Sequence, residues 1–173
     1  MLRTLQAAYE FTRANDVPTI WSSFLRKDTH PVLQFVKYGV FGVMAVIIYQ
    51  GTFGFLGHTV FPHFEGSLRD GAPVDDAQRK VYFILASAAG FLLADVFAYV
   101  ANLLWVFQGG RHRRVVEFLL FTAASSIGWA IGMIPGILAF GSDHAGSWAS
   151  SGIVTITSVI VNYLCRKLFI FHG

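Results

Sequence analysis

The segment NYLCRKLFIF, residues 162–171, ends a long apolar run with two adjacent cations and several aromatic side chains. A similar segment, AYVANLLWVF, occupies residues 98–107, which lie 64 positions earlier. The similarity of the two segments predicts that the chain contains two copies of one helical hairpin. The aligned pairs are Tyr99 with Tyr163, Asn102 with Arg166, Leu104 with Leu168, Trp105 with Phe169 and Phe107 with Phe171.

The composition indicates a membrane protein. Of the 173 residues, 54% are hydrophobic and only 13% are charged, whereas soluble domains average about 25% charged residues. The length gives room for one domain. Cys165 is the single cysteine, which excludes an internal disulfide framework and a cysteine-based metal cluster. The six histidines are scattered without a metal-binding spacing, so we expect neither a metal ion nor a cofactor.

Four apolar runs are long enough to cross a membrane, because about 20 helical residues span the hydrocarbon core. The polar loop 57–80 separates the first two runs, and a basic turn at 109–114 separates the second from the third. Pro135 is expected to kink or end the third helix. The predicted fold is therefore an all-α integral membrane protein with four transmembrane helices. The expected spans are about 36–56, 81–107, 118–140 and 148–170.

The two predicted hairpins have the same orientation. The first span opens with Gln34 and Phe35, the third opens with Glu117 and Phe118, and both start on the same side of the membrane. This arrangement predicts a tandem duplication about an axis along the membrane normal, unlike the inverted repeats of many transporters. Glycines in the first span are expected to allow close helix contact. These glycines are Gly39, Gly42, Gly51 and Gly54.

Residues 1–33 form a separate N-terminal segment in front of the membrane domain, residues 34–173. Apolar and charged positions are mixed in this segment, and an apolar patch at 20–25 precedes Arg26 and Lys27. This pattern is typical of short helices that lie on a membrane surface, where cations meet anionic headgroups and aromatic rings enter the interface. An ordinary cytosolic tail is the alternative.

The distribution of lysine and arginine predicts that both termini lie in the cytosol. With that orientation, ten cations fall on the cytosolic side and three on the other side. Such an asymmetry follows the positive-inside rule. The three outer cations are Arg69, Arg79 and Lys80.

Several motifs resemble those of the GtrA-like family. They are Gln34-Phe35 at the start of the first span, Gly39 and Gly42 within it, Asn-Leu-Leu-Trp-Val-Phe at 102–107, and Asn-Tyr-x-x-Arg-Lys-x-Phe-x-Phe at 162–171. The resemblance covers about residues 34–171. At one point the chain departs from the family pattern, because Leu103 stands where the family often has a cation.

The resemblance implies a small four-helix membrane protein of cell-surface polysaccharide synthesis or glycosylation. The implied role is to move polyprenyl-phosphate-linked monosaccharides across the cytoplasmic membrane, or to assist a glycosyltransferase that uses them. A bacterial-type inner membrane is therefore the expected location. The expected partners are a polyprenyl-phosphate lipid, the surrounding membrane lipids and a glycosyltransferase.

Asp95 and Asn102 are the candidate site residues inside the membrane. A carboxyl group at mid-span is costly in lipid, so Asp95 is expected to face protein or a polar cavity. Asn102 follows seven residues later, which places it on about the same face of the helix. This polar stripe could contact a sugar or carry a proton. The alternative is that Asp95 is a hydrogen-bonded packing residue.

A cationic rim is expected at the cytosolic ends of the helices. Arginine there can bind a lipid phosphate through two hydrogen bonds, and a lysine in the first turn can extend to the headgroups. The alternative is that these cations set the topology and bind anionic lipid loosely. The candidate residues are Lys37, Arg113, Arg114, Asn162, Arg166 and Lys167, with Arg111 beside them.

The leading hypothesis is a flippase, or a translocation subunit, for a polyprenyl-phosphate monosaccharide. A membrane anchor for a glycosyltransferase and a small proton-coupled exporter are the alternatives. The chain has no glycine-rich nucleotide loop and no hydrolase motif, so we expect no enzymatic activity. The short basic turn does not suggest nucleic-acid binding. Because four short helices enclose little volume, we expect a homo-oligomer.

Overall fold

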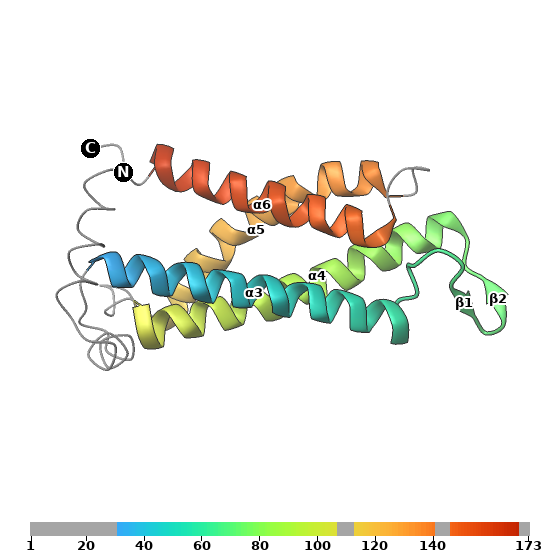
Figure 1. The fold of residues 1–173 in the computed structure, drawn as a ribbon, viewed down its shortest axis with the longest axis horizontal. Coiled ribbons are helices and arrows are strands. Elements are labelled where there is room, and N and C mark those ends of the chain that lie inside the picture. Colours follow the sequence, from blue (N-terminus) through green and yellow to red (C-terminus); the bar gives the residue numbers. More distant parts are fainter. Residues whose placement is uncertain (1–30, 107–112, 141–145, 170–173) are drawn as a thin grey trace, which may run out of the picture.

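The computed structural model describes residues 31–106, 113–140 and 146–169. Within these ranges, the side chains of residues 31, 32, 35 and 162–169 are not described. Each predicted span corresponds to a helix (Figure 1), and a five-residue π-helix, η1 (Asn102–Val106), extends the second one. The expected surface segment falls almost entirely on residues 1–30, outside the described part of the chain. The four long helices are α3 (Pro31–Thr59), α4 (Asp76–Ala101), α5 (Arg114–Ala139) and α6 (Ser147–Phe169).

The helices have the length and the surface of membrane spans. Three segments are long and apolar enough to cross a bilayer: Val36–Thr59, Asp76–Val106 and Arg114–Ala139. Helix α6 has 23 residues, which also exceeds the span length of about 20. Large apolar side chains point away from the bundle, where lipid tails can cover them. Examples are Val43, Ile47 and Leu138, with 63%, 65% and 76% of their surface exposed.

The helices pair as two hairpins. α3 packs along α4 and α5 packs along α6, whereas α4 meets α5 over a shorter stretch. In Figure 1 the start of α3, the end of α4 and the end of α6 lie at one end of the bundle. The turn between α3 and α4 lies at the other end. The chain therefore contains the pair of hairpins expected from the repeat, while the face that lies in the cytosol stays a prediction.

Glycines bring the helices of the second hairpin close together. A Cβ atom at Gly132 would lie 2.6 Å from the Val154 carbonyl oxygen of α6, and one at Gly136 would overlap the Val154 side chain. Such close backbone approach is typical of small residues in membrane helices. In the first hairpin this role falls to Gly90, whose added Cβ would lie 2.9 Å from the carbonyl oxygen of Tyr49.

The expected packing role of the α3 glycines is only partly seen. A Cβ atom at Gly54 would meet the ring of Trp148 on α6. At Gly39, Gly42 and Gly51 it would meet no described atom within 4 Å. These three glycines face open space because α4 packs against other positions of α3, so their expected role in helix contact is wrong within the described structure.

Helix α5 runs through Pro135 and ends four residues later, at Ala139. Phe140 follows the helix and its backbone N–H donates to the Gly136 carbonyl at 3.0 Å. Of the two expected effects of Pro135, the end of the helix at this residue is wrong, and a kink there stays a prediction. The Phe140 ring packs on Phe83 of α4, with 4.6 Å between the ring centroids. Contacts of this kind hold the helix end in place.

The predicted polar loop 57–80 contains a small β-turn unit as well as helix ends. Strand β1 (Leu68–Arg69) pairs antiparallel with β2 (Ala72–Pro73). Asp70 and Gly71 connect the strands with φ angles of 53° and 82°. Two successive positive φ angles define the tight turn that favours an Asp-Gly pair. The same dipeptide is visible in the sequence and is the signal from which this hairpin could have been predicted.

Candidate functional site

A cavity of about 190 Å³ lies where the two hairpins face each other. All four long helices contribute to its wall, which is mostly aromatic and aliphatic. A concave, largely apolar site with a few convergent polar groups is the usual form of a small-molecule site. We refer to it as the interhairpin cavity. Its polar lining residues are Tyr38, Tyr49, Asp95, Asn102, Ser125, Thr155 and Ser158.

Asp95 connects the two hairpins at this cavity. The residue is 94% buried on α4, with 6% of its surface exposed. Thr122 of α5 donates its hydroxyl hydrogen to Asp95 Oδ2 across 2.6 Å. Within the described part of the chain, no Lys, Arg or His forms an ion pair with the carboxyl group. Asp95 therefore lies, as expected, against protein and a cavity rather than lipid.

Asn102 lines the same cavity about two helical turns after Asp95, at the first residue of η1. Its side-chain Nδ2 donates to the Ala98 carbonyl at 2.8 Å. Its Oδ1 is buried and has no hydrogen-bond partner among the described residues. A buried polar atom without a partner costs about 1–3 kcal/mol. The two residues of the predicted stripe are thus brought together, and one of them presents an unused acceptor.

The π-helix η1 begins at Asn102, where α4 would otherwise continue as a regular helix. The Asn102 backbone N–H is shared between the carbonyls of Ala98 and Tyr99. Single π-helical turns within α-helices are frequent at functional sites. The sequence predicted an unbroken helix here, because the apolar residues of 102–106 fit either type of helix.

A hydrogen-bonded cluster fixes two aromatic rings in the cavity wall. Tyr49 of α3 and Trp129 of α5 both bond to the buried hydroxyl of Ser87, at 2.7 and 3.2 Å. The Trp129 ring also stacks on Phe91, with 5.2 Å between the centroids. Rings held in this way keep one orientation. The sequence did not reveal this cluster, since its members lie on three different helices.

Polar side chains also join α3 to α6 across the hairpins. Gln50 Nε2 donates to the Thr155 hydroxyl at 3.1 Å, and the Ser151 hydroxyl donates to Gln50 Oε1 at 3.0 Å. Both polar ends of the Gln50 amide are therefore satisfied. Thr155 also lines the interhairpin cavity. Sequence reasoning missed this link, because a single glutamine in an apolar run does not identify its partners.

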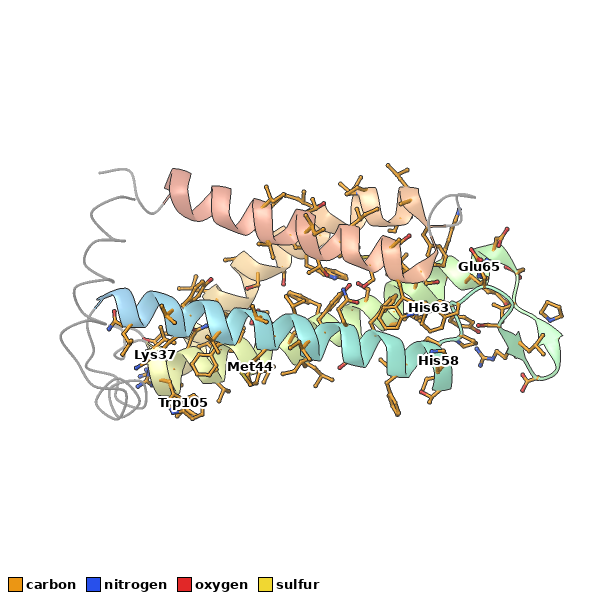
Figure 2. The ribbon with its side chains drawn as sticks, viewed as in Figure 1. Lys37, Met44, His58, His63, Glu65 and Trp105 are labelled. Atoms are coloured by element: carbon orange, nitrogen blue, oxygen red, sulfur yellow. The ribbon has the colours of Figure 1, made fainter. Side chains whose placement is uncertain are left out.

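Lys37 lies inside the protein rather than at an exposed rim. Its side chain is fully buried, and Nζ donates to the Trp105 carbonyl at 3.5 Å. Figure 2 shows Lys37 and Trp105 together at one end of the bundle. The carbonyls at a helix end carry partial negative charge, which explains why the cation turns toward η1. The expectation that Lys37 extends to the headgroups is not met.

Arg113 and Arg114 lie exposed at the start of α5. Arg113 is the residue before the first helical turn, and Arg114 forms an ion pair with Glu117 at 3.2 Å. The Tyr99 hydroxyl donates to the Arg114 carbonyl at 3.0 Å, which places this basic turn beside the end of α4. Neither arginine lines the cavity. The side chains of Asn162, Arg166 and Lys167, and all of Arg111, lie outside the described residues.

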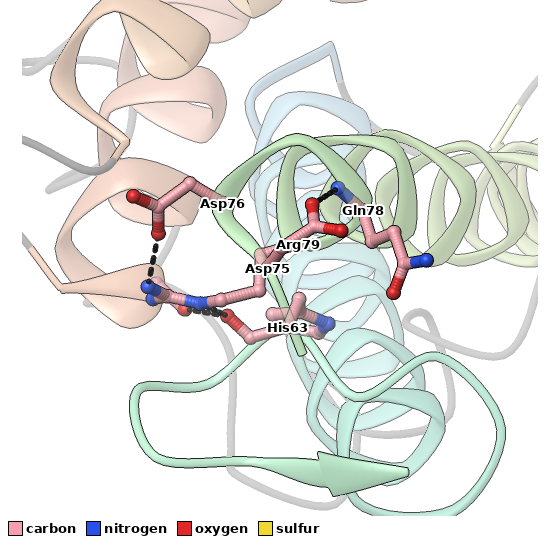
Figure 3. A network of polar contacts seen from close by, with 6 residues as sticks. His63, Asp75, Asp76, Gln78 and Arg79 are labelled. Carbon is pink, nitrogen blue, oxygen red and sulfur yellow. Dashed lines mark hydrogen bonds and ion pairs between the residues drawn. The ribbon is translucent and has the colours of Figure 1, made fainter. Parts of the chain in front are cut away.

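The opposite end of the bundle is held by the backbone of His63 (Figure 3). Its carbonyl accepts hydrogen bonds from the Ser147 hydroxyl of α6 at 2.8 Å and from Arg79 Nε of α4 at 3.4 Å. Arg79 also pairs with Asp76 at 3.2 Å. The loop is therefore tied to both hairpins at one residue, a role that the sequence did not indicate.

The His63 ring is buried among aromatic side chains. Its Nδ1 bonds to the Phe61 carbonyl at 2.8 Å, while Nε2 has no partner among the described residues. Burial lowers the pKa of His63 from 6.5 to about 4. The described residues contain no group of three His, Cys, Asp or Glu side chains that could hold a metal ion. At neutral pH this histidine is therefore an uncharged packing residue.

Comparison with known protein families identifies a relationship. The model of a family described as GtrA/DPMS, transmembrane domain, matches residues 37–171. This range contains all four long helices except the first turns of α3. Neither a curated protein nor a solved structure matches the chain.

Proposed function

The chain belongs to the GtrA/DPMS transmembrane-domain family, and from this premise we propose that it moves a polyprenyl-phosphate-linked monosaccharide across a membrane, alone or as a subunit. The lipid tail stays in the bilayer while the sugar passes through the protein. A polar sugar cannot cross hydrocarbon without a large loss of hydrogen bonds to water. The protein must therefore supply replacement contacts at membrane depth.

The interhairpin cavity is the observation that carries this proposal. It combines aromatic rings with the carboxyl group of Asp95 and the unused acceptor of Asn102. Aromatic faces can pack on the apolar face of a sugar ring, and carboxyl and amide oxygens can accept hydrogen bonds from its hydroxyl groups. The cavity lies between the hairpins, so a small change in their separation would alter access to it.

Cations at one end of the bundle are suited to the lipid phosphate. Arg113 and Arg114 lie exposed there, at the start of α5 beside the end of α4, whereas the buried Lys37 adds positive charge at that end without reaching the surface. In the proposal, Asn162, Arg166 and Lys167 of α6 complete this basic end. A phosphate at headgroup level gains charge-assisted hydrogen bonds from such groups.

The proposal places the basic end in the cytosol of a bacterial-type inner membrane, with both termini on that side. The chain would act without enzymatic activity, nucleic acid or cofactor, next to a glycosyltransferase that makes or uses the lipid. Four helices enclose a cavity of about 190 Å³, so a complete path would form at an interface between copies of the chain.

Transport in liposomes tests the proposal directly. Purified protein is reconstituted in phosphatidylethanolamine and phosphatidylglycerol vesicles that contain labelled polyprenyl-phosphate glucose, and access of the sugar to membrane-impermeant periodate is followed. We expect faster transbilayer movement than in protein-free vesicles. Equal rates in the two preparations would refute the proposal.

The same assay separates transport from a role as a membrane anchor. Asp95→Leu removes the carboxyl group from the cavity, so translocation should fall at least about tenfold, the usual scale for the loss of a buried polar contact. An anchor for a glycosyltransferase has no use for this group. Unchanged glycosyltransferase binding together with unchanged lipid movement in Asp95→Leu would favour the anchor.

A further inference from the structure

Two lining residues of the interhairpin cavity, Asp95 and Asn102, carry hydrogen-bond acceptors. Asp95 contributes two carboxyl oxygens, of which Oδ2 already accepts from Thr122. Asn102 contributes an Oδ1 atom that is buried without a partner in the described structure, while its Nδ2 is engaged with Ala98. The indole N–H of Trp129 is likewise engaged, with Ser87. The unused acceptor of Asn102 and the carboxyl group of Asp95 favour a ligand that donates hydrogen bonds.

Within the described part of the chain, no positive charge balances the Asp95 carboxyl group at the cavity. Among the described lining residues there is no Lys, Arg or His. Lys37, the buried cation on α3, donates to the Trp105 carbonyl and does not line the cavity. In a low-dielectric interior, two like charges a few ångströms apart repel by several kcal/mol. An ionised Asp95 would therefore reject a ligand that carries a carboxylate.

A protonated Asp95 would not reverse this preference. In that form the side chain has a single O–H donor and keeps its remaining acceptor capacity. One neutral donor does not compensate for the desolvation of a carboxylate in a dry site. The acceptor of Asn102 would still face the ligand. Both protonation states of Asp95 thus favour a ligand group that donates hydrogen bonds and carries no negative charge.

Building on the proposed transport function, we infer that the cavity selects uncharged or amino-bearing sugars and excludes acidic ones such as uronic acids. The selectivity resides in Asp95 and Asn102, not in the basic end of the bundle. The phosphate of the carrier lipid is common to all substrates and stays at the headgroup level. The sugar alone enters the cavity and is discriminated there by charge.

The test compares three carrier lipids with one polyprenyl chain, bearing glucose, a 4-amino sugar or glucuronic acid. Each is incorporated in phosphatidylethanolamine and phosphatidylglycerol vesicles with the full-length protein. Glucose and the amino sugar should cross at comparable rates, and glucuronic acid at least about tenfold more slowly. Equal rates for glucose and glucuronic acid would overturn the inference.

Asp95→Asn removes the charge and keeps the shape of the side chain. In this variant the ratio of glucose to glucuronic acid transport should fall toward one, through a gain for the acid as well as any loss for glucose. Glu117→Gln is the matched control, because it makes the same chemical change on α5 at a carboxyl group that pairs with Arg114 and does not line the cavity. An unchanged ratio in Asp95→Asn would contradict the role of Asp95.

A binding measurement keeps the inference distinct from the transport proposal. The affinities of short-chain prenyl-phosphate glucose and glucuronic acid are measured in detergent by calorimetry. A higher affinity for the glucose lipid, with a smaller preference in Asp95→Asn, would support the selectivity. If no lipid then crosses the vesicle membrane, only the proposed transport function fails. Equal affinity for both sugars would refute the selectivity whatever the transport result.

Discussion

The surroundings of the Asn102 side chain lower the stability of the fold rather than raise it, which indicates a functional role. Its Oδ1 is buried without a partner among the described residues, and the side chain is 93% buried, with 7% of its surface exposed. The single hydrogen bond from Nδ2 to Ala98 contributes about 1 kcal/mol, while the unsatisfied oxygen costs about 1–3 kcal/mol. At this position an apolar residue of similar size would be tolerated or preferred by the fold.

Asn102→Leu should therefore separate stability from function. We expect the thermal unfolding midpoint in detergent to stay the same or rise, while lipid translocation in vesicles falls at least about tenfold. Gln50→Leu is the comparison, because both ends of that amide are satisfied by α6 and its loss should lower the midpoint. A fall in the midpoint of Asn102→Leu equal to that of Gln50→Leu would contradict this view of Asn102.

His63 makes stability depend on pH. The folded-state pKa is about 4, below the ordinary value of 6.5, because the ring is buried. Above pH 6.5 the ring is neutral in both states and nothing is lost. As the pH falls from 6.5 to about 4, the unfolded chain takes up a proton that the folded chain refuses. Stability is therefore lost as the pH falls through this window, in the direction set by the lowered pKa.

This dependence is checked by the unfolding midpoints of the native protein and of His63→Gln. Both are measured between about pH 8 and about pH 4, a range that includes the ordinary titration of histidine. The native midpoint should fall in the acid part of the range, and His63→Gln should show a smaller fall. The carboxyl groups are the same in both proteins, so their contribution cancels in the comparison. Parallel curves for the two proteins would show that His63 does not carry the effect.

At the scale of helices, the α5–α6 contact depends on residues without side chains. Gly132→Ala would place a Cβ against the Ser158 hydroxyl and 2.6 Å from the Val154 carbonyl oxygen. The backbone of α6 must move to accept it, at a cost of about 1–3 kcal/mol. We expect a lower unfolding midpoint in detergent and a weakened second hairpin.

Gly39→Ala is the control for this substitution. It makes the same change in α3 at a position where a Cβ meets no described atom within 4 Å. Alanine has the higher helix propensity, by about 0.8–1.0 kcal/mol in a soluble helix, so Gly39→Ala should be neutral or stabilising. If both variants lost the same stability, close packing at Gly132 would not be the cause.

At the scale of the whole molecule, the cation-rich end of the bundle fixes a prediction about orientation. Arg113 immediately precedes α5 and Asp70 lies between β1 and β2; both are exposed, and in Figure 1 the start of α5 and the β1–β2 unit lie at opposite ends of the bundle. In a background with Cys165→Ser, Asp70→Cys should react with a membrane-impermeant maleimide in intact cells. Arg113→Cys should react only after the membrane is opened, because the cation-rich end stays in the cytosol. The reverse pattern of labelling would invert the proposed topology.

The sequence predicted the four helices because long apolar runs and polar turns are local features. It also brought Asp95 and Asn102 to one face, since a spacing of seven residues is two helical turns. It did not predict the burial of Lys37, whose hydrogen-bond acceptor, the Trp105 carbonyl, lies 68 residues away in the sequence. The Ser87 cluster and the Gln50 link were missed for the same reason, as their partners come from different helices.

The π-helix has a consequence for the internal repeat. The segments 98–107 and 162–171 align without a gap, yet η1 winds as a π-helix while α6 stays α-helical to Phe169. A regular α-helix turns by about 100° per residue, and a π-helical turn takes an additional residue to complete. Beyond Asn102, positions that correspond in sequence therefore differ in angular phase about their helix axes. The repeat is therefore present in the sequence but not in the symmetry of the structure. Replacing 98–107 by the sequence of 162–171 would make the repeat exact, but it would point the side chains beyond position 102 in other directions.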